Sequence, residues 1–269
     1  MTVEDPGAPP ADNGEFWLFG YGSLIWKPPP HFDRRIPGWV NGYVRRFWQE
    51  AIKMPRHVLE INQDHRGTPE KPGRVVTLIE HSFWKTLRDV HPAPADGKVW
   101  GVAYRIKPSH VAEVKEYLDI REINGYSIHY TPFHPAPTSS SPQPDPIRTL
   151  VYIGTPDNDQ FTGPQDIDAL AAHIHRSEGP SGLNRAYLLS LDESLRELSP
   201  ESGDEHVTDL AERVRALIAR EEGEGVAEGG SGTGGQGEAV SRETGETAAV
   251  RHEFSRAESV DEQEETEKV

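Results

Sequence analysis

The chain contains no cysteine among its 269 residues. Disulfide scaffolds, thiol nucleophiles and thiolate metal sites are therefore excluded together. A basic excess is also missing, because the formal net charge is −16 at pH 7, whereas nucleic-acid binding calls for a patch of Lys and Arg. No apolar run approaches the roughly 20 residues that a membrane-spanning helix needs, and the N-terminus lacks the pattern of a secretory signal. We expect a cytoplasmic protein that binds neither nucleic acid nor membranes.

The acidity is concentrated at the C-terminal end. Residues 221–269 hold 14 Asp and Glu against 4 Lys and Arg, which gives −10 of the total charge. The same segment contains a Gly- and Ser-rich run at 229–237, and such composition buries too little apolar area to order itself. We therefore predict a flexible leader at 1–14, a folded domain at 15–221 and a disordered acidic tail at 222–269 without a catalytic role.

Within the folded domain, strand patterns come first and helix patterns come mostly later. Four helices are expected, the first three capped by Ser109, Asp166 and Asn184, and the fourth covering 207–218. This order favours the α+β class, and the crowding of strands favours a small closed or nearly closed β-barrel with flanking helices. The predicted strands, rich in β-branched and aromatic residues and bounded by turn formers, are 16–19, 39–48, 74–80, 98–106, 126–134 and 148–154.

Two stretches interrupt this pattern. Residues 50–63 separate a predicted strand from a charged segment that ends in glycine. Residues 135–146 are rich in Pro and Ser and predict a long surface loop.

A short glycine-containing motif, Gly20-Tyr21-Gly22-Ser23, follows the first apolar run directly. Glycine permits positive φ or the close approach of a ligand to bare backbone N–H groups, and successive N–H groups can hold an anion. The motif is not a P-loop, because no Gly-Lys-Ser/Thr follows it. It is not a hydrolase nucleophile elbow either, because Ile25 stands where the second glycine belongs. Taken alone, it fits either a simple turn or an anion-binding loop.

The candidate polar residues are compatible with structural roles as well as functional ones. The chain has twelve histidines but no His-Glu-x-x-His, and His173 and His175 point in different directions on a predicted helix, so no metal site is predicted. His65 precedes a glycine turn and is equally compatible with a backbone contact or a substrate contact. Glu122 lies beside Arg121, where a predicted helix gives way to a strand. It is either a structural ion-pair partner or a functional carboxylate.

Eight blocks of sequence occur in a characteristic order. They are Phe19-Gly-Tyr-Gly-Ser-Leu-Ile-Trp-Lys27, Arg45-Arg-Phe-Trp-Gln49, Asp64-His-Arg-Gly67, Lys71-Pro-Gly-Arg-Val-Val-Thr-Leu78, Val99-Trp-Gly-Val-Ala-Tyr-Arg105, Tyr117-Leu-Asp-Ile-Arg-Glu122, Tyr152-Ile-Gly-Thr155 and Gly179-Pro-Ser-Gly-x-Asn184. Through these blocks the chain, over roughly residues 16–218, resembles the ChaC family of glutathione-specific γ-glutamylcyclotransferases.

The resemblance implies a small α+β barrel with a cavity for a γ-glutamyl group. It implies the reaction of glutathione to 5-oxoproline and Cys-Gly without metal or cofactor, with Glu122 as the catalytic acid and base. Glutathione is the only partner implied, and the sequence does not indicate an oligomeric state. The implied substrate-binding residues are Leu18, Phe19, Gly20, Tyr21, Gly22, Ser23, Leu24 and Tyr126, with His65, Arg66 and Tyr117 as further contacts.

The sequence departs from the family pattern at two places. Asn124-Gly125 replaces a Gly-Gly pair, which is a mild change because Asn tolerates left-handed backbone angles. The insertion at 50–63 replaces a short connection, so the roles of residues 49–67 stay open. Two alternative functions remain: a cyclotransferase for other γ-glutamyl amines, and a non-catalytic γ-glutamyl-binding protein with the same fold.

Overall fold

The computed structural model describes residues 14–51, 67, 71–122 and 126–228, and for 117–122 and 224–228 it describes the backbone alone. The chain divides into two units, 1–228 and 229–269, and all described residues belong to the first. The predicted leader, most of the insertion and the predicted tail beyond 228 therefore lie outside the described residues.

The first unit is built on a closed five-stranded barrel with the strand order β1-β5-β2-β6-β7. Neighbouring strands are antiparallel except β1 and β7, which pair in parallel through Leu18 and Leu150. The predicted α+β class, with a small closed barrel and flanking helices, is confirmed. The barrel strands are β1 (Phe16–Gly20), β2 (Phe32–Asn41), β5 (Lys98–Ile106), β6 (Tyr126–Pro135) and β7 (Ile147–Gly154).

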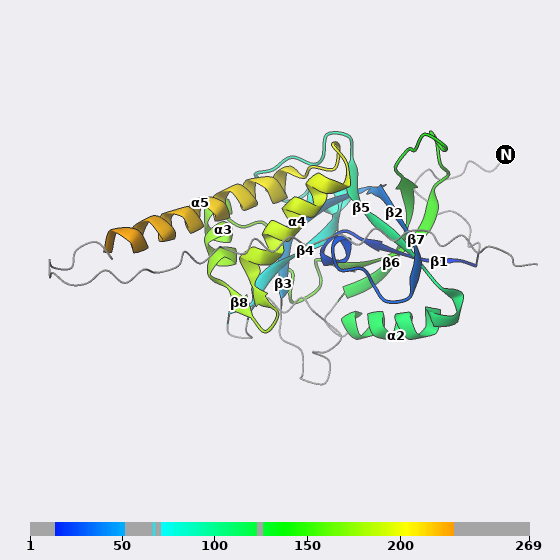
Figure 1. The fold of residues 1–269 in the computed structure, drawn as a ribbon, viewed down its shortest axis with the longest axis horizontal. Helices are drawn as coiled ribbons and strands as arrows, with labels where there is room; N and C mark the ends of the chain where they lie inside the picture. The colour runs from blue at the N-terminus through cyan, green and yellow to red at the C-terminus, as the bar shows by residue number, and fades with distance from the viewer. Residues whose placement is uncertain (1–13, 52–66, 68–70, 123–125, 229–269) are drawn as a thin grey trace, which may run out of the picture. The chain divides into compact units, whose positions relative to one another are not determined.

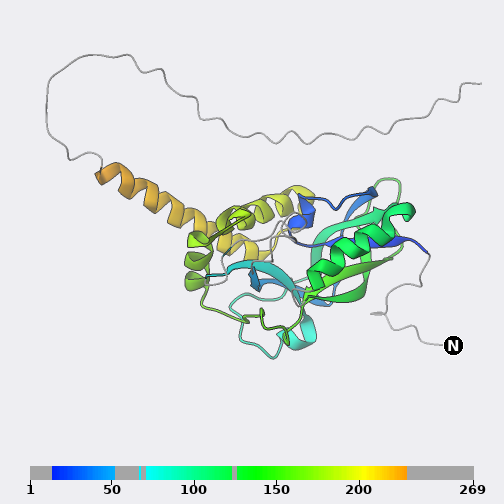
Figure 2. The same ribbon diagram turned by 90° about the horizontal axis from the view of Figure 1, so that it is seen from below.

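A second, two-stranded antiparallel sheet and most of the helices lie beside the barrel. The sheet pairs β3 (Tyr43–Ala51) with β4 (Gly73–Glu80). Figures 1 and 2 show α3, α4 and α5 gathered around this sheet, whereas α2 runs along the outside of the barrel. The helices are α1 (His81–Trp84), α2 (Val111–Glu122), α3 (Ile167–Arg176), α4 (Asn184–Leu198) and α5 (Glu205–Glu228), with 3-10 turns η1 (Ser23–Ile25) and η3 (Pro108–His110) and a short pair β8 (Glu178–Gly179) and β9 (Gly182–Leu183).

The predicted strand 39–48 is wrong as a single element. Gly42 has φ +84 and divides it into the end of β2 and the start of β3, which belong to different sheets. The sequence also missed the first half of β2, because Arg34, Arg35 and Pro37 obscure the strand pattern there. The other five predicted strands occur within a residue or two of their expected bounds, and residues 136–146 form the expected connection outside helices and strands.

The starts of the helices agree with the sequence only in part. Asp166 caps α3 as predicted, accepting a 2.9 Å hydrogen bond from the Ala169 N–H. Ser109 lies inside η3, and Lys107 is the residue that precedes the turn. Asn184 is the first residue of α4 and does not cap it, because its side chain is bonded to another element.

The last helix is longer than predicted. α5 continues past residue 221 to Glu228, so the helix extends about two turns beyond residue 222, where the tail was expected to begin. Among the described residues, no helix has both the length and the apolar character needed to cross a membrane.

Candidate active site

The glycine motif lies at one rim of the barrel, where β1 and β7 both end. These strands run in the same direction with Leu18 opposite Leu150, so Gly20 and Gly154 reach the same rim. β6 begins at this rim, since its first residue, Tyr126, pairs with Gly154. The last residue of α2, Glu122, is only four positions before Tyr126. The topology thus places the glycine loop and the start of β6 at one end of the barrel.

Tyrosine hydroxyl groups hold the loop on two sides. Tyr21 donates a 2.7 Å hydrogen bond to the carbonyl of Tyr152 on β7. Tyr104, on β5, donates a 2.7 Å hydrogen bond to the carbonyl of Leu24. Burial raises the pKa of the Tyr104 phenol, so this hydroxyl remains a neutral donor. The loop is consequently attached to the two strands that flank β1 in the barrel.

The two glycines of the motif are required by crowding. A Cβ on Gly20 would lie 2.5 Å from the Leu24 Cβ. A Cβ on Gly22 would lie 2.9 Å from the Tyr187 hydroxyl and 3.0 Å from Val76 Cγ2. Gly22 has φ −128, so the left-handed conformation that the sequence allowed is not the reason for glycine there. Glycine stands there because neighbouring side chains approach the backbone closely.

Most side chains of the motif belong to the core. Leu18 and Phe19 are fully buried in the barrel, where the Phe19 ring packs on Phe133 with 5.6 Å between centroids. Tyr21 and Ser23 are buried as well, and Leu24 is half-buried. Any ligand of this segment therefore meets chiefly its backbone groups.

Several predicted site residues are not described as side chains. Glu122 and Tyr117 belong to α2, but only their backbone is described. His65 and Arg66 lie outside the described residues. Tyr126 is described and is half-buried at the start of β6.

The helix α4 supports the glycine loop from its third side. Asn184 accepts a 2.7 Å hydrogen bond from the Arg74 N–H and donates a 2.7 Å hydrogen bond to the Arg74 carbonyl, which fixes the start of α4 on β4. One turn later, the buried Tyr187 packs edge-on against Phe47 and places its hydroxyl next to Gly22. The roles of Tyr104 and Tyr187 were not predicted from the sequence, and Asn184 was predicted only as a helix cap.

The end of β7 is joined to the second sheet at the same rim. The Gly154 N–H donates a 2.9 Å hydrogen bond to Thr77 Oγ1, which in turn donates to the Gly154 carbonyl at 3.2 Å. A Cβ on Gly154 would lie 2.4 Å from Gln49 Oε1. Glycine at this position therefore lets the barrel and the β3–β4 sheet meet without a gap.

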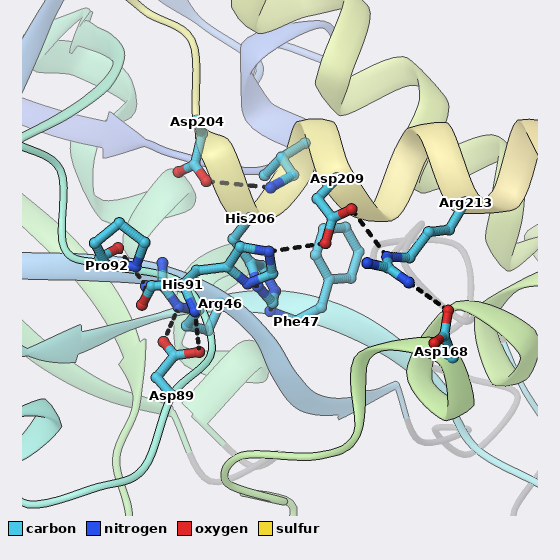
Figure 3. Close-up of polar contacts among 11 residues, drawn as sticks. Arg46, Phe47, Asp89, His91, Pro92, Asp168, Asp204, His206, Asp209 and Arg213 are labelled. Atoms are coloured by element: carbon cyan, nitrogen blue, oxygen red, sulfur yellow. Dashed lines mark hydrogen bonds and ion pairs between the residues drawn. The ribbon is translucent and has the colours of Figure 1, made fainter.

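The paired arginines of β3 are structural. Arg45 is fully buried and donates to Asp204 at 3.4 Å and to the Trp100 carbonyl. Arg46 binds Asp89 and donates to the Pro92 carbonyl at 2.9 Å, as Figure 3 shows. Burial lowers the pKa of Arg45, because it penalises the charged guanidinium. These arginines hold β3 to the segment before α5 and to the 89–92 segment.

A chain of histidines continues this buried network (Figure 3). The Phe47 N–H donates to His206 Nε2 at 3.1 Å, so the neutral His206 carries its proton on Nδ1. His206 Nδ1 lies 3.1 Å from His91 Nδ1, and His91 Nε2 lies 2.9 Å from Asp209. Each ring thus accepts on one side and donates on the other, with the direction fixed by a backbone N–H. Burial, followed by the charge of Arg46, holds the pKa of His206 well below its ordinary value.

The fold and the rim define a class of protein: a small closed-barrel α+β domain with a glycine-containing loop at one rim. The comparisons identify the family. A family model described as ChaC-like protein matches residues 16–217. The chain belongs to the ChaC-like family.

Its relatives cover nearly the whole folded unit. A Schizosaccharomyces pombe protein named glutathione-specific γ-glutamylcyclotransferase is 44% identical over 207 residues, which is 77% of this chain and 96% of the relative. A human protein named glutathione-specific γ-glutamylcyclotransferase 1 is 34% identical, covering 78% of this chain and 84% of the relative. A crystal structure of a γ-glutamyl cyclotransferase specific to glutathione from yeast has 36% identity and a TM-score of 0.63, covering 75% and 96% of the two chains.

Proposed function

We propose that this protein degrades glutathione to 5-oxoproline and Cys-Gly. The observation that supports the proposal is the position of the glycine loop at the barrel rim where β6 begins, four positions after Glu122. The relatives from fission yeast and human, both named glutathione-specific γ-glutamylcyclotransferases, support the same reaction.

The substrate supplies its own nucleophile in this reaction. Its α-amine attacks the γ-carbonyl, a new C–N bond closes the five-membered ring, and the bond to the nitrogen of Cys-Gly breaks. Well-oriented intramolecular reactions reach effective molarities of about 10⁵–10⁸ M, so orientation is the main task of the protein. Backbone N–H groups from Tyr21 to Leu24 hold the α-carboxylate or the developing oxyanion, while Ser23 serves as a ligand and not as a nucleophile.

The proton must move from the amine to the leaving nitrogen. An α-amine of pKa ~8 is mostly ammonium at neutral pH, and an ordinary glutamate of pKa ~4.3 is a weak base for it, a mismatch of roughly 5 kcal/mol. A rim position shielded from water would raise the glutamate pKa and reduce this gap. In the proposed mechanism Glu122 accepts the ammonium proton and then delivers a proton to the departing amide nitrogen.

A second candidate function concerns other γ-glutamyl amines. A relative from Arabidopsis thaliana, 37% identical, is named γ-glutamylcyclotransferase 2-3 without mention of glutathione. Release of 5-oxoproline from γ-glutamyl-alanine at a rate similar to that from glutathione would favour this broader activity.

The proposed role of Glu122 is tested by the substitution Glu122→Gln. General acid–base catalysis contributes about 10²–10⁴-fold, so we expect 5-oxoproline release from glutathione to fall by that factor. Glu116→Gln is the matched control, since Glu116 is an exposed carboxylate on the same helix. If a folded Glu122→Gln protein works at the parent rate, the assignment of the base is wrong. If the parent protein releases no 5-oxoproline from either substrate, the proposed reaction is wrong, and the result favours a non-catalytic γ-glutamyl-binding protein.

A further inference from the structure

Two histidines and a glutamate meet at the opposite end of α2 from Glu122. His31 precedes β2, His110 ends η3, and Glu113 lies in the first turn of α2. His31 Nε2 is 3.1 Å from Glu113 Oε1, and His110 Nδ1 is 2.8 Å from Glu113 Oε2. One ligand atom from each of the three residues lies within 4.8 Å of the others. One carboxylate therefore joins two imidazoles that come from distant parts of the sequence.

The backbone fixes this arrangement through Lys107. The Lys107 N–H donates a 2.9 Å hydrogen bond to the His31 carbonyl, and the His110 N–H donates a 2.9 Å hydrogen bond to the Lys107 carbonyl. These bonds continue the β2–β5 ladder, whose neighbouring pair is Phe32 and Ile106. His31 has φ +59, a conformation that non-glycine residues adopt uncommonly. Both histidines are thus held by the end of the barrel and not by a free loop.

The three side chains are open to an ion, and both histidine rings already contact the same carboxylate. The side chains are 35%, 36% and 62% exposed for His31, His110 and Glu113, so an ion in solution reaches them directly. The two imidazole rings stack with 3.8 Å between centroids and 4° between planes. Because a metal lies in the plane of each ligating ring, the rings must turn out of this stack to bind one ion.

We propose that His31, His110 and Glu113 bind a divalent transition-metal ion, with zinc the best chemical match. Two imidazole nitrogens and a carboxylate oxygen form a set that suits zinc and its neighbours in the first transition row. Calcium and magnesium prefer all-oxygen ligands and do not match it. The imidazole nitrogens lie 3.1 and 2.8 Å from the Glu113 oxygens, and rotation of the stacked rings is needed before all three groups form metal–ligand bonds of about 2.0–2.2 Å, with water completing the coordination.

Local sequence spacing did not predict this site. Glu113 follows His110 by three positions on a helical turn, but His31 is 82 positions away from Glu113. The ion would link the start of β2 to the start of the helix that ends at Glu122. At about 1.5 Å per residue, the length of α2 separates the metal site from Glu122 by on the order of 15 Å, so metal binding and the proposed reaction are separate properties.

Metal titration of the full chain tests the proposal. Zn²⁺ is added in competition with a chromophoric chelator, and Co²⁺ is used as a spectroscopic probe of imidazole coordination. We expect one ion per chain and a rise in the unfolding temperature with Zn²⁺. Residues that only hydrogen-bond to a metal ligand typically contribute about 10–100-fold to metal affinity. Loss of a direct ligand should cost at least as much, so we expect His31→Ala, His110→Ala and Glu113→Gln each to weaken Zn²⁺ binding by that factor or more.

His129→Ala is the matched control, because His129 is a half-exposed histidine on β6 outside the cluster. It should leave both the affinity and the Zn²⁺-induced rise in unfolding temperature unchanged. Glu113→Gln retains an exposed polar side chain, so it keeps the test valid if a histidine variant folds poorly. The proposal is overturned if the parent chain binds Zn²⁺ no more tightly than ~1 mM, or if the three variants bind as the control does.

Discussion

At the scale of single residues, Gly22 shows why the loop after β1 has a glycine between Tyr21 and Ser23. Its position is limited by the Tyr187 hydroxyl on one side and by Val76 on the other. The loop therefore takes its shape from the helix and the strand pressed against it. Crowding by tertiary neighbours explains the glycine better than backbone handedness does.

Gly22→Ala should reduce 5-oxoproline release strongly while leaving the protein folded. The new Cβ forces the loop away from Tyr187 or Val76, and loop displacements of about 1 Å can cost on the order of 10²-fold in rate. Steady-state kinetics with glutathione measure this effect. Gly203→Ala is the control, since a Cβ there meets nothing within 4 Å.

A second substitution tests the stated cause. Tyr187→Phe removes the hydroxyl that the new Cβ would approach at 2.9 Å. In the background of Tyr187→Phe, Gly22→Ala should therefore cost less activity than it does in the parent. An equal loss in both backgrounds would show that the hydroxyl is not what excludes a side chain at position 22.

At the scale of elements, the start of α4 is held by a neighbouring strand. The Asn184 side-chain amide forms hydrogen bonds with the N–H and the carbonyl of Arg74, and no side chain caps the helix. Asp166, by contrast, caps its own helix through one exposed hydrogen bond. Two residues with similar capping propensity thus have different structural roles.

Asn184→Ala should destabilise the protein more than Asp166→Ala. The first substitution leaves two buried backbone groups of β4 unpaired, for a loss of about 2–4 kcal/mol in the free energy of unfolding. The second removes one cap, which is typically worth ~1 kcal/mol. Chemical denaturation measures both values. Equal losses would mean that Asn184 acts as an ordinary cap.

The histidine chain between β3 and α5 makes stability depend on pH. His206 stays neutral in the folded protein because its pKa is held well below the ordinary value, whereas in the unfolded chain it titrates near 6.5. Below pH ~6.5 the unfolded state therefore binds more protons. The stabilisation is fully present above that pH and is lost as pH falls toward the folded pKa.

We expect the free energy of unfolding to fall by up to ~1.4 kcal/mol per pH unit below pH ~6.5 from this one group. His206→Gln keeps an acceptor for the Phe47 N–H but removes the titration, so its stability should vary less between pH 7.5 and pH 5.5. His129→Gln should retain the parental slope. An unchanged slope in His206→Gln would assign the acid sensitivity to other groups.

At the scale of the whole molecule, the folded unit should suffice for activity. The family match ends at residue 217, and α5 ends at Glu228. A chain shortened to residues 1–228 should keep the parental rate of 5-oxoproline release and the parental unfolding temperature. A large decrease in the rate or in the unfolding temperature would show that the acidic segment at 229–269 has a role that its composition does not predict.

Much of the barrel was predictable, because its strands carry local signals. The strand 98–106 was predicted with its observed bounds, since an apolar run at 99–104 forms its centre. The break at Gly42 was not predictable from apolar pattern alone, because apolar residues continue on both sides of it. The assignment of β2 and β3 to different sheets depends on long-range pairing.

The sequence by itself determined the family, the α+β class, the candidate loop at 20–24 and the candidate base, Glu122, because these depend on local composition and on ordered blocks of residues. Tertiary structure alone decided that the loop and the start of β6 share one rim. It also decided that Tyr104 and Tyr187 support the loop, and that His31 joins His110 and Glu113. The physical reason is that strand register and helix packing bring together residues whose separation along the chain carries no local signal.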